Sequence, residues 1–416
     1  MTYLPLKGLP GNARYCILLE PLWALTGTVV LFYATFYMKS VGLSNLSIGI
    51  ILSVNLYLGF IFQILAGAVT DRLGRRRTSL VFDLLGWALP MLLWAVADNF
   101  WVFLIAYLFF ACSTVVNISF SLLATEDTPE ADRPRVFAAV KLIALGAGLL
   151  TPVAGVLMAE YGVVPTMRII YLVGAITMLV QFVWRNYLTR ETAAGLAAMD
   201  HHRSTGMARS VATSLRLFWR LARHRRMWPL IGLQVTTTLA VTINIFQVIY
   251  LVEVLKIDAG TISWVPALTA AVALLCFLVL LPRLRERPLV NATQAALVLS
   301  AVGWLLFLLT PPHGVLLLMI STAVTAGGVF LTETYRDSLV VSTLEDRDRA
   351  AMFGSMQSVT AMVAIPSGFV AALLYNIRPQ LLFIIVFLLY AAGAAFAFRL
   401  RPSGSTDDLP LAATYS

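Results

Sequence analysis

The chain has 416 residues, of which 59% are hydrophobic and only 12% are charged, whereas a soluble domain carries about 25% charged residues. Because the apolar residues are spread along the whole chain, this composition excludes a soluble protein built around one core. The net charge of +9 does not indicate nucleic-acid binding, because the basic residues fall in alternate short polar segments and not on one face.

Apolar segments of about 20 residues, the length that crosses a bilayer, follow one another along the sequence. They predict an all-α integral membrane protein with twelve transmembrane helices. The first segment is too long for the core of a signal peptide, and no small-residue cleavage site follows it, so we expect it to be retained. The predicted spans are 14–38, 46–70, 78–97, 100–124, 136–159, 164–186, 228–252, 261–282, 289–309, 314–336, 350–375 and 379–399.

The loops between these spans differ strongly in charge. One set of loops, which includes both ends of the chain, holds 26 of the 30 Lys and Arg residues, and the opposite set holds only Lys39, Arg168, Lys256 and Arg378. Basic loops stay in the cytoplasm, so we expect both termini to be cytoplasmic. Compact loops and the absence of targeting signals favour a prokaryotic cell membrane.

One long polar insertion divides six spans from six. We therefore expect an N-terminal bundle (1–186), a cytoplasmic central loop (187–227), a C-terminal bundle (228–400) and a disordered tail (401–416). Near its end the loop interleaves Leu215, Phe218 and Trp219 with arginines. This pattern favours a basic amphipathic helix on membrane lipids of the inner leaflet, and a solvated linker is the plainer alternative.

The two halves repeat each other at an offset of 214 residues. Residues 132–135 and 346–349 both read Asp-Arg-X-Arg, and a proline follows each Asp at a distance of twenty residues, as Pro152 and Pro366. The end of the first span, 37–49, falls on 251–263. Such repeats are typical of transporters, whose substrate site lies where the repeats meet. The two prolines predict helix kinks.

A charged loop between the second and third spans carries a distinct pattern. It reads Gly67-Ala-Val-Thr-Asp71-Arg72-Leu-Gly74-Arg75-Arg76-Arg77. Glycine at the first position allows close helix packing, and the second glycine permits a tight turn. The Asp can cap a helix N-terminus. The arginines can bridge to acids at the inner ends of neighbouring spans, for which the candidates are Glu126, Asp127 and Asp337.

This loop resembles the signature of the major facilitator superfamily in both pattern and place. The resemblance implies two six-helix bundles, transport by alternating access, a monomer, and a loop that acts as a latch for the outward-open state. A second stretch, from Gly148 to Gly155, resembles the antiporter motif of this superfamily, with Thr151 in place of the Gly before Pro152. The resemblance is to drug/proton antiporter-like bacterial members.

Charged side chains inside the spans require an explanation, because each costs several kcal/mol at membrane depth. They are Glu20, Asp83, Lys141 and Glu333. A carboxyl in an apolar site holds its proton more tightly, so Glu20, Asp83 and Glu333 are candidate proton or substrate sites. Glu20 and Asp83 are the expected proton carriers, and Glu20 could also meet a cationic substrate. Alternatively, these acids pair with Lys141 or loop arginines and only brace the inner gate.

The resemblance also implies that spans one, four, seven and ten line the substrate cavity. Uncharged polar and aromatic residues recur on them at helical spacing, and these predict a mildly polar, aromatic cavity. They are Trp23, Tyr33, Tyr37, Tyr107, Ser113, Asn117, Ser121, Gln234, Thr238, Thr242, Thr322 and Thr325. No arginine is expected at mid-membrane, so multiply charged anions are disfavoured, and a hydrophobic or amphipathic substrate is favoured.

These observations together predict a proton-coupled efflux transporter for small hydrophobic or amphipathic molecules. A lipid or lysolipid translocator and an uptake symporter for a neutral nutrient are the alternatives. A channel would need neither the repeat nor the loop motif, and an enzyme would need clustered catalytic groups. We expect no metal or cofactor, because neither the histidines nor the cysteines form a ligand set; they are His201, His202, His224, His313, Cys16, Cys112 and Cys276.

Overall fold

The computed structural model describes residues 8–201, 228–283, 288–343 and 349–399. Within these ranges the chain is helical, and it contains twelve helical stretches, several of them made of successive shorter helices, that are long and apolar enough to cross a membrane. The predicted amphipathic segment of the central loop and the predicted disordered tail lie outside the described residues. So does the side chain of Asp337.

The N-terminal half contains six spans. They are α1 (Gly11–Leu19) with α2 (Pro21–Ser40); α3 (Asn45–Leu73); α4 (Arg75–Asp83) with the π-helical η1 (Leu84–Ala88) and α5 (Leu89–Val96); α6 (Phe100–Phe110) with α7 (Ser113–Thr125); α8 (Arg133–Gly148) with α9 (Thr151–Tyr161); and α10 (Val163–Leu188). A short helix, α11 (Ala193–His201), follows the sixth span.

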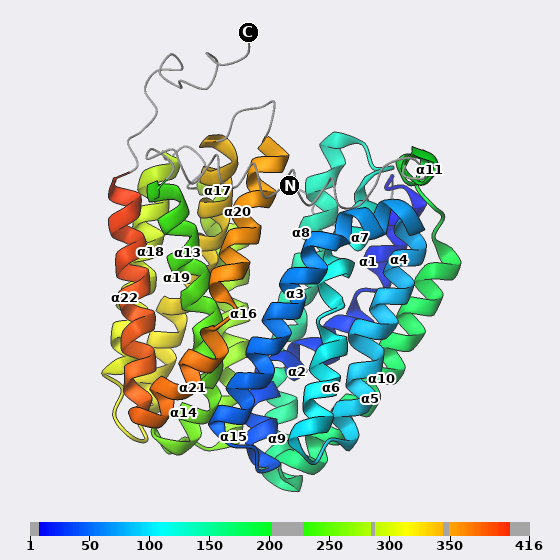
Figure 1. Ribbon diagram of the computed structural model, residues 1–416. Coiled ribbons are helices and arrows are strands. Elements are labelled where there is room, and N and C mark those ends of the chain that lie inside the picture. The colour runs from blue at the N-terminus through cyan, green and yellow to red at the C-terminus, as the bar shows by residue number, and fades with distance from the viewer. Residues whose placement is uncertain (1–7, 202–227, 284–287, 344–348, 400–416) are drawn as a thin grey trace.

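The C-terminal half repeats this plan. Its spans are α13 (Trp228–Ile243), η4 (Asn244–Phe246) and α14 (Gln247–Glu253); α15 (Ala259–Ile262), α16 (Trp264–Leu275), η5 (Cys276–Leu280) and α17 (Leu281–Arg283); α18 (Leu289–Leu308); α19 (Val315–Thr343); α20 (Arg349–Ala364) with α21 (Ser367–Ile377); and α22 (Pro379–Phe398). The two halves stand side by side as separate bundles (Figure 1).

Prolines coincide with breaks in three spans. α8 ends before Thr151 and Pro152, α20 ends before Pro366, and Pro21 begins α2 directly after Glu20. Proline has no amide N–H to continue the helical ladder, so each of these prolines lies at, or next to, the first residue of a new helical segment. The breaks beside Pro152 and Pro366 fall at equivalent places in the sequence repeat. One consequence is that Glu20 lies at a discontinuity of the first span.

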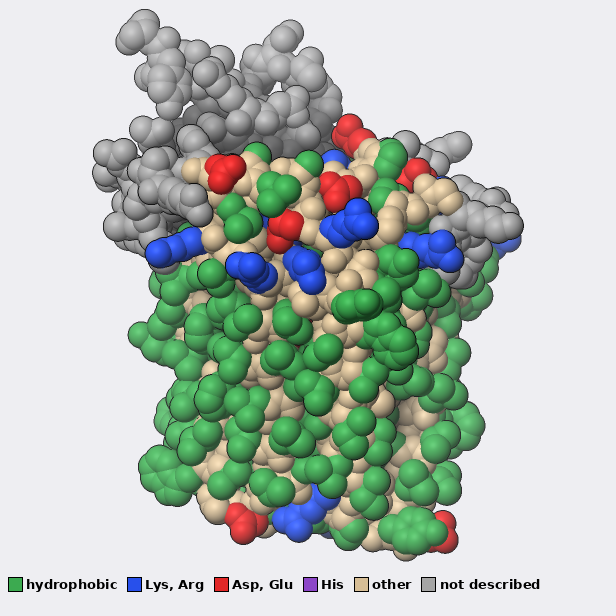
Figure 2. Space-filling view, turned by 90° about the vertical axis from the view of Figure 1, so that its right-hand side faces the viewer, with side chains coloured by type: hydrophobic (Ala, Val, Ile, Leu, Met, Phe, Trp, Pro, Cys, Tyr) green, Lys and Arg blue, Asp and Glu red, His purple; other side chains and the backbone are tan. Residues whose placement is uncertain are grey.

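The surface has the layering of a membrane protein. Figure 2 shows a broad hydrophobic belt, a band of Lys and Arg side chains near one rim, and few charges at the other. Large apolar side chains are exposed within the belt, as at Ile176 and Val180 on α10. We call the rim where α1 begins and α22 ends the basic end, and the other rim the opposite end. The protein is therefore built to cross a membrane several times.

Candidate functional site

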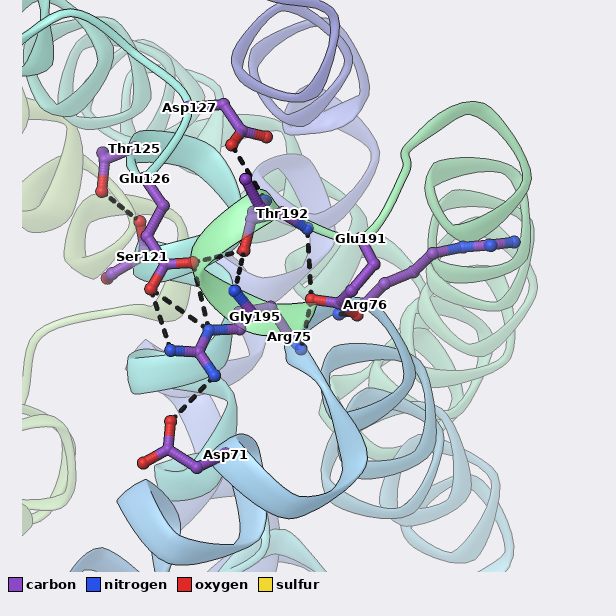
Figure 3. A network of polar contacts seen from close by, with 11 residues as sticks. Asp71, Arg75, Arg76, Ser121, Thr125, Glu126, Asp127, Glu191, Thr192 and Gly195 are labelled. Carbon is purple, nitrogen blue, oxygen red and sulfur yellow. Dashed lines mark hydrogen bonds and ion pairs between the residues drawn. The ribbon is translucent and has the colours of Figure 1, made fainter. Parts of the chain in front are cut away.

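The loop between α3 and α4 forms a compact ionic cluster at the basic end (Figure 3). Arg75 is at its centre: its Nη1 donates to Asp71 Oδ1 (2.8 Å), and its Nε and Nη2 donate to the Glu126 carboxylate (3.0–3.2 Å). The Arg75 side chain is nearly buried, with 7% exposed. Bidentate pairing of this kind is the strong form of an ion pair, so Arg75 fastens the second span to the fourth.

A second carboxylate, that of Glu191, caps the third span. It accepts hydrogen bonds from the backbone N–H groups of Arg75 (2.8 Å) and Arg76 (3.0 Å), which are the first amides of α4. A carboxylate at a helix N-terminus satisfies free donors and faces the positive end of the helix dipole. The first amides of α4 are thus bound by a carboxylate from the segment after α10, whereas Asp71, which the sequence offered as a cap, accepts from the Arg75 side chain.

This segment, Thr189–His201, packs on the N-terminal bundle. Thr192 donates its hydroxyl proton to Glu126, and the Asn12 side chain is hydrogen-bonded to the backbone of Arg190 in both directions (2.9 Å each). Asp127 accepts from Asn12 (3.2 Å). The sequence placed these residues in the central loop, but their contacts attach them to the first bundle. Nothing in the sequence marked Glu191 or Thr192, because neither belongs to a recognisable motif.

The two glycines of the loop differ in their surroundings. Gly74 has φ of +84°, and a Cβ atom there would lie 2.5 Å from a Glu191 oxygen, so both the turn and the docking require glycine. A Cβ atom on Gly67 would meet nothing within 4 Å, so the expected close helix packing at Gly67 is absent. Arg72 is exposed, and Arg76 Nε donates to the carbonyl of Asn186 (2.7 Å).

A second ionic cluster is buried inside the N-terminal half. Asp83 at the end of α4 pairs with Arg185 on α10, and the two residues are 2% and 3% exposed. The guanidinium also stacks near the rings of Phe120 (5.2 Å) and Phe182 (5.5 Å). A π-helical turn follows Asp83 directly, a distortion that often accompanies functional sites. Arg185 is one of the 26 basic residues that the sequence counted with the loops, and the structure shows it as a buried residue of the sixth span.

Glu20 belongs to the same cluster. It is buried, and its carboxyl interacts electrostatically with both Arg185 and Asp83. Lys141, which the sequence suggested as a partner for these acids beside the loop arginines, is exposed, and its Nζ lies 5.9 Å from the ring centroid of Phe330. The cluster thus holds two carboxyls and one guanidinium. Asp83 has the guanidinium as its direct partner, whereas Glu20 makes no ion pair with the residues that the structure describes.

Four of the residues predicted to line the cavity fall into three environments. Tyr37 is fully buried and donates to the Trp94 carbonyl (2.9 Å), so it packs inside the N-terminal bundle and does not line a cavity. Thr325 packs against Gly303 of α18, which places it inside the C-terminal bundle. Asn117 is exposed on α7, and Thr238 is half-buried on α13.

Polar residues of the C-terminal half form their own contacts near the basic end. Gln234 on α13 is buried and donates to Gln357 on α20 (3.0 Å). Arg336 on α19 donates to Thr237 (3.0 Å). Glu333 is half-buried one turn before Arg336. At an offset of 214, Gln234 is the repeat equivalent of Glu20. The two halves therefore carry a neutral amide and an acid at matching depths.

The two halves touch each other at the opposite end. Polar contacts that join described residues across the halves lie there: Thr35 to the Ile245 carbonyl (2.8 Å), Phe369 N–H to Ser53 (2.8 Å), Asn45 to Asn376 (2.9 Å) and Lys39 to Glu253 (3.5 Å). A Cβ atom on Gly49 would lie 2.5 Å from the Gly368 carbonyl, and Gly155 packs against Ser263. Because 49 and 263 are repeat equivalents, both crossings use the same place in the fold.

Comparisons with known proteins agree with this architecture. A family model described as Major Facilitator Superfamily matches residues 22–335, and the chain belongs to that family. It is a multi-pass membrane transporter of this fold, and the predicted family and fold class are confirmed. A comparison with curated proteins found no match.

Solved structures share the fold at low sequence identity. A POT family transporter in complex with 5-aminolevulinic acid is 14% identical, with a TM-score of 0.71 and coverage of 95% of this chain and 97% of that one. The nucleoside transporter NupG is 15% identical (TM-score 0.70; 94% and 98% covered). The inward-open xylose transporter XylE from E. coli is 14% identical (TM-score 0.70; 94% and 96% covered).

Proposed function

We propose that this transporter exchanges protons for a small hydrophobic or amphipathic molecule by alternating access, with efflux as the direction. The observation that carries the proposal is the buried cluster of Glu20, Asp83 and Arg185. The Arg185 guanidinium can neutralise only one of the two carboxylates. The other carboxylate would carry an uncompensated charge in apolar surroundings, which favours its protonated form. Glu20, whose carboxyl has no ion pair or hydrogen bond within the described part of the chain, is therefore the proton carrier.

The position of Glu20 also supports exchange. It lies at the break between α1 and α2, in a span that the family resemblance assigns to the substrate pathway. A protonated Glu20 makes the cluster neutral, and an ionised Glu20 leaves it with one net negative charge. A cationic group of a substrate is attracted only to the ionised form, so proton and substrate compete for one site. Competition of this kind couples two flows in opposite directions.

The contacts between the halves support alternating access. They close the opposite end, and the strong charge bias of the loops supports a cytoplasmic position for the basic end. The described conformation is then the inward-facing one, and XylE in its inward-open form is among the similar structures.

The test uses proteoliposomes that contain a pH-sensitive dye. A proton gradient is imposed, and lipophilic cations, neutral drugs, sugars and lysolipids are added one class at a time. The wild type should dissipate the gradient with lipophilic cations or neutral drugs. Glu20→Gln should abolish proton movement but still allow substrate to run down its own gradient, whereas Glu160→Gln, at an exposed acid of the opposite end, should behave as wild type.

Other outcomes would overturn the proposal. Unchanged proton flux in Glu20→Gln would remove the carrier role of this residue. A response to sugars alone would favour uptake of a neutral nutrient. Scrambling of labelled lipid in the same vesicles, without a response to any soluble compound, would identify a lipid translocator.

A further inference from the structure

A groove lies on the outer surface of the C-terminal half, away from both ionic clusters. It measures about 440 Å³, and α18 and α22 line it. Along α18 the lining residues recur at helical spacing, and the end of α22 contributes one aromatic side chain. The lining residues are Asn291, Gln294, Ala295, Val298, Leu299, Val302 and Phe398.

The dimensions of the groove match one leaflet of a bilayer. From Asn291 to Val302 the lining covers eleven helical steps, which is about 16 Å at 1.5 Å per residue. The hydrocarbon core of a bilayer is about 30 Å thick, so the groove runs from the basic end to the region of the midplane. Exposed valine and leucine side chains form its walls. This shape and chemistry fit one extended alkyl chain.

Polar groups are confined to the mouth of the groove at the basic end. Asn291 is exposed, and its amide makes no hydrogen bond to the residues that the structure describes. Gln294, one turn deeper, donates to the Ala397 carbonyl (3.0 Å) and joins the two helices at the groove floor. Arg399 is exposed and directly follows the lining residue Phe398, so it adds a positive charge at the end of α22. An amide and a guanidinium at the mouth suit a phosphate group.

We propose that this groove is a binding site for one anionic phospholipid. One acyl chain lies along α18 from Val302 to Asn291, and the phosphate and its anionic headgroup meet the Asn291 amide and Arg399. The site is independent of the proton cluster, because it lies on the outer surface of the other half. Binding there fixes α18 to α22 and thereby stabilises the C-terminal bundle.

The test measures retention of a single lipid by the full-length protein in neutral detergent, using native mass spectrometry. Phosphatidylglycerol is titrated against phosphatidylcholine with the same acyl chains. The wild type should prefer phosphatidylglycerol about fivefold, the effect of one basic residue near a membrane surface. Val298→Trp fills the groove and should weaken retention of the first lipid at least tenfold. Arg399→Gln should bind both lipids equally.

Matched controls separate this site from the general lipid shell. Val180→Trp on α10 changes a valine of similar exposure (41%, against 45% for Val298) at similar depth, and it should retain lipid as the wild type does. Arg378→Gln removes a charge at the other end of α22 and should keep the preference. Equal behaviour of Val298→Trp and Val180→Trp would overturn the groove site. An undiminished preference in Arg399→Gln would overturn the anionic specificity.

Discussion

The buried pair of Asp83 and Arg185 allows a quantitative test of the N-terminal cluster. Arg185→Met keeps much of the side-chain volume but leaves the Asp83 carboxylate unpaired beside Glu20. Removing one partner of a buried ion pair typically costs about 3–5 kcal/mol, and we expect this range. Asp83→Asn should cost less, about 1–3 kcal/mol, because the guanidinium keeps a hydrogen-bond acceptor and the field of Glu20.

The double variant provides the decisive comparison. The double variant Asp83→Asn with Arg185→Met removes both charges of the pair, so neither charge is left unpaired. Its loss of unfolding free energy should therefore be smaller than the sum of the two single losses by at least about 2 kcal/mol. Unfolding free energies of the purified protein in detergent, from denaturant titration at pH 7, give all four corners of the cycle. The same cycle at the half-exposed pair Asp132–Arg135 is the control, and its coupling should be about 0–1 kcal/mol.

Proton uptake gives the test a second readout. In Arg185→Met the two carboxyls are left without a cation, and they can become neutral by binding protons. The loss of unfolding free energy relative to the wild type should therefore shrink as the pH is lowered from 8 to 5. The deficit of Asp83→Asn should not shrink in this way. Additive losses in the cycle, or a deficit of Arg185→Met that is independent of pH, would refute the assignment of these residues to one electrostatic unit.

Three further predictions concern the helix junctions. Gly49→Ala should slow transport at least tenfold in the vesicle assay, because the added Cβ atom collides with a backbone carbonyl of α21 and opposes closure of the opposite end. Gly67→Ala adds its Cβ atom in open space and should transport normally. Equal rates for the two variants would contradict the role of the contact at Gly49. Glu191→Ala removes the cap of α4 and should lower stability by about 1 kcal/mol and speed amide exchange of Thr189–His201; unchanged exchange would show that another contact docks the segment. Asp258 caps α15, and its hydrogen bonds from Thr261 lower the pKa of its carboxyl. Its contribution to stability is therefore present above the unfolded pKa of about 3.9 and is lost as the pH falls through the lower pKa of the folded state. The unfolding midpoint of Asp258→Ala should lie below that of the wild type at pH 7 and approach it near pH 3, and a constant difference would contradict this.

The sequence by itself determined the class of architecture. Hydrophobic length, loop charge and the repeat at 214 residues are local or periodic properties, so they predicted twelve spans in two halves without any knowledge of contacts. The loop from Gly67 to Arg77 identified the family, because its pattern and its place are both visible in one dimension. The bridge from Arg75 to Glu126 was also foreseen, since both residues had to lie at the same rim.

Only the tertiary structure decided which side chains meet. The rotation of each helix about its axis fixes partners, and hydropathy does not encode it. Arg185 lay within its own predicted span, yet it was counted as a loop charge, because a buried and a snorkelling arginine look alike at the end of a span. Lys141 and the loop arginines were the predicted partners of Asp83, and the structure pairs it with an arginine, Arg185. Helix rotation likewise decides that the ring of Tyr37, which was predicted to line the cavity, packs inside the bundle.

Long-range docking was equally hidden from the sequence. Glu191 caps a helix that begins more than a hundred residues earlier, and no local pattern announces a cap supplied from so far away. The closed end of the molecule likewise depends on the close approach of Gly49 to a helix of the other half. The sequence repeat shows that residues 49 and 263 are equivalent positions, but it does not show which residues of the other half they contact. Local chemistry thus set the helical elements, and packing between distant segments set the site.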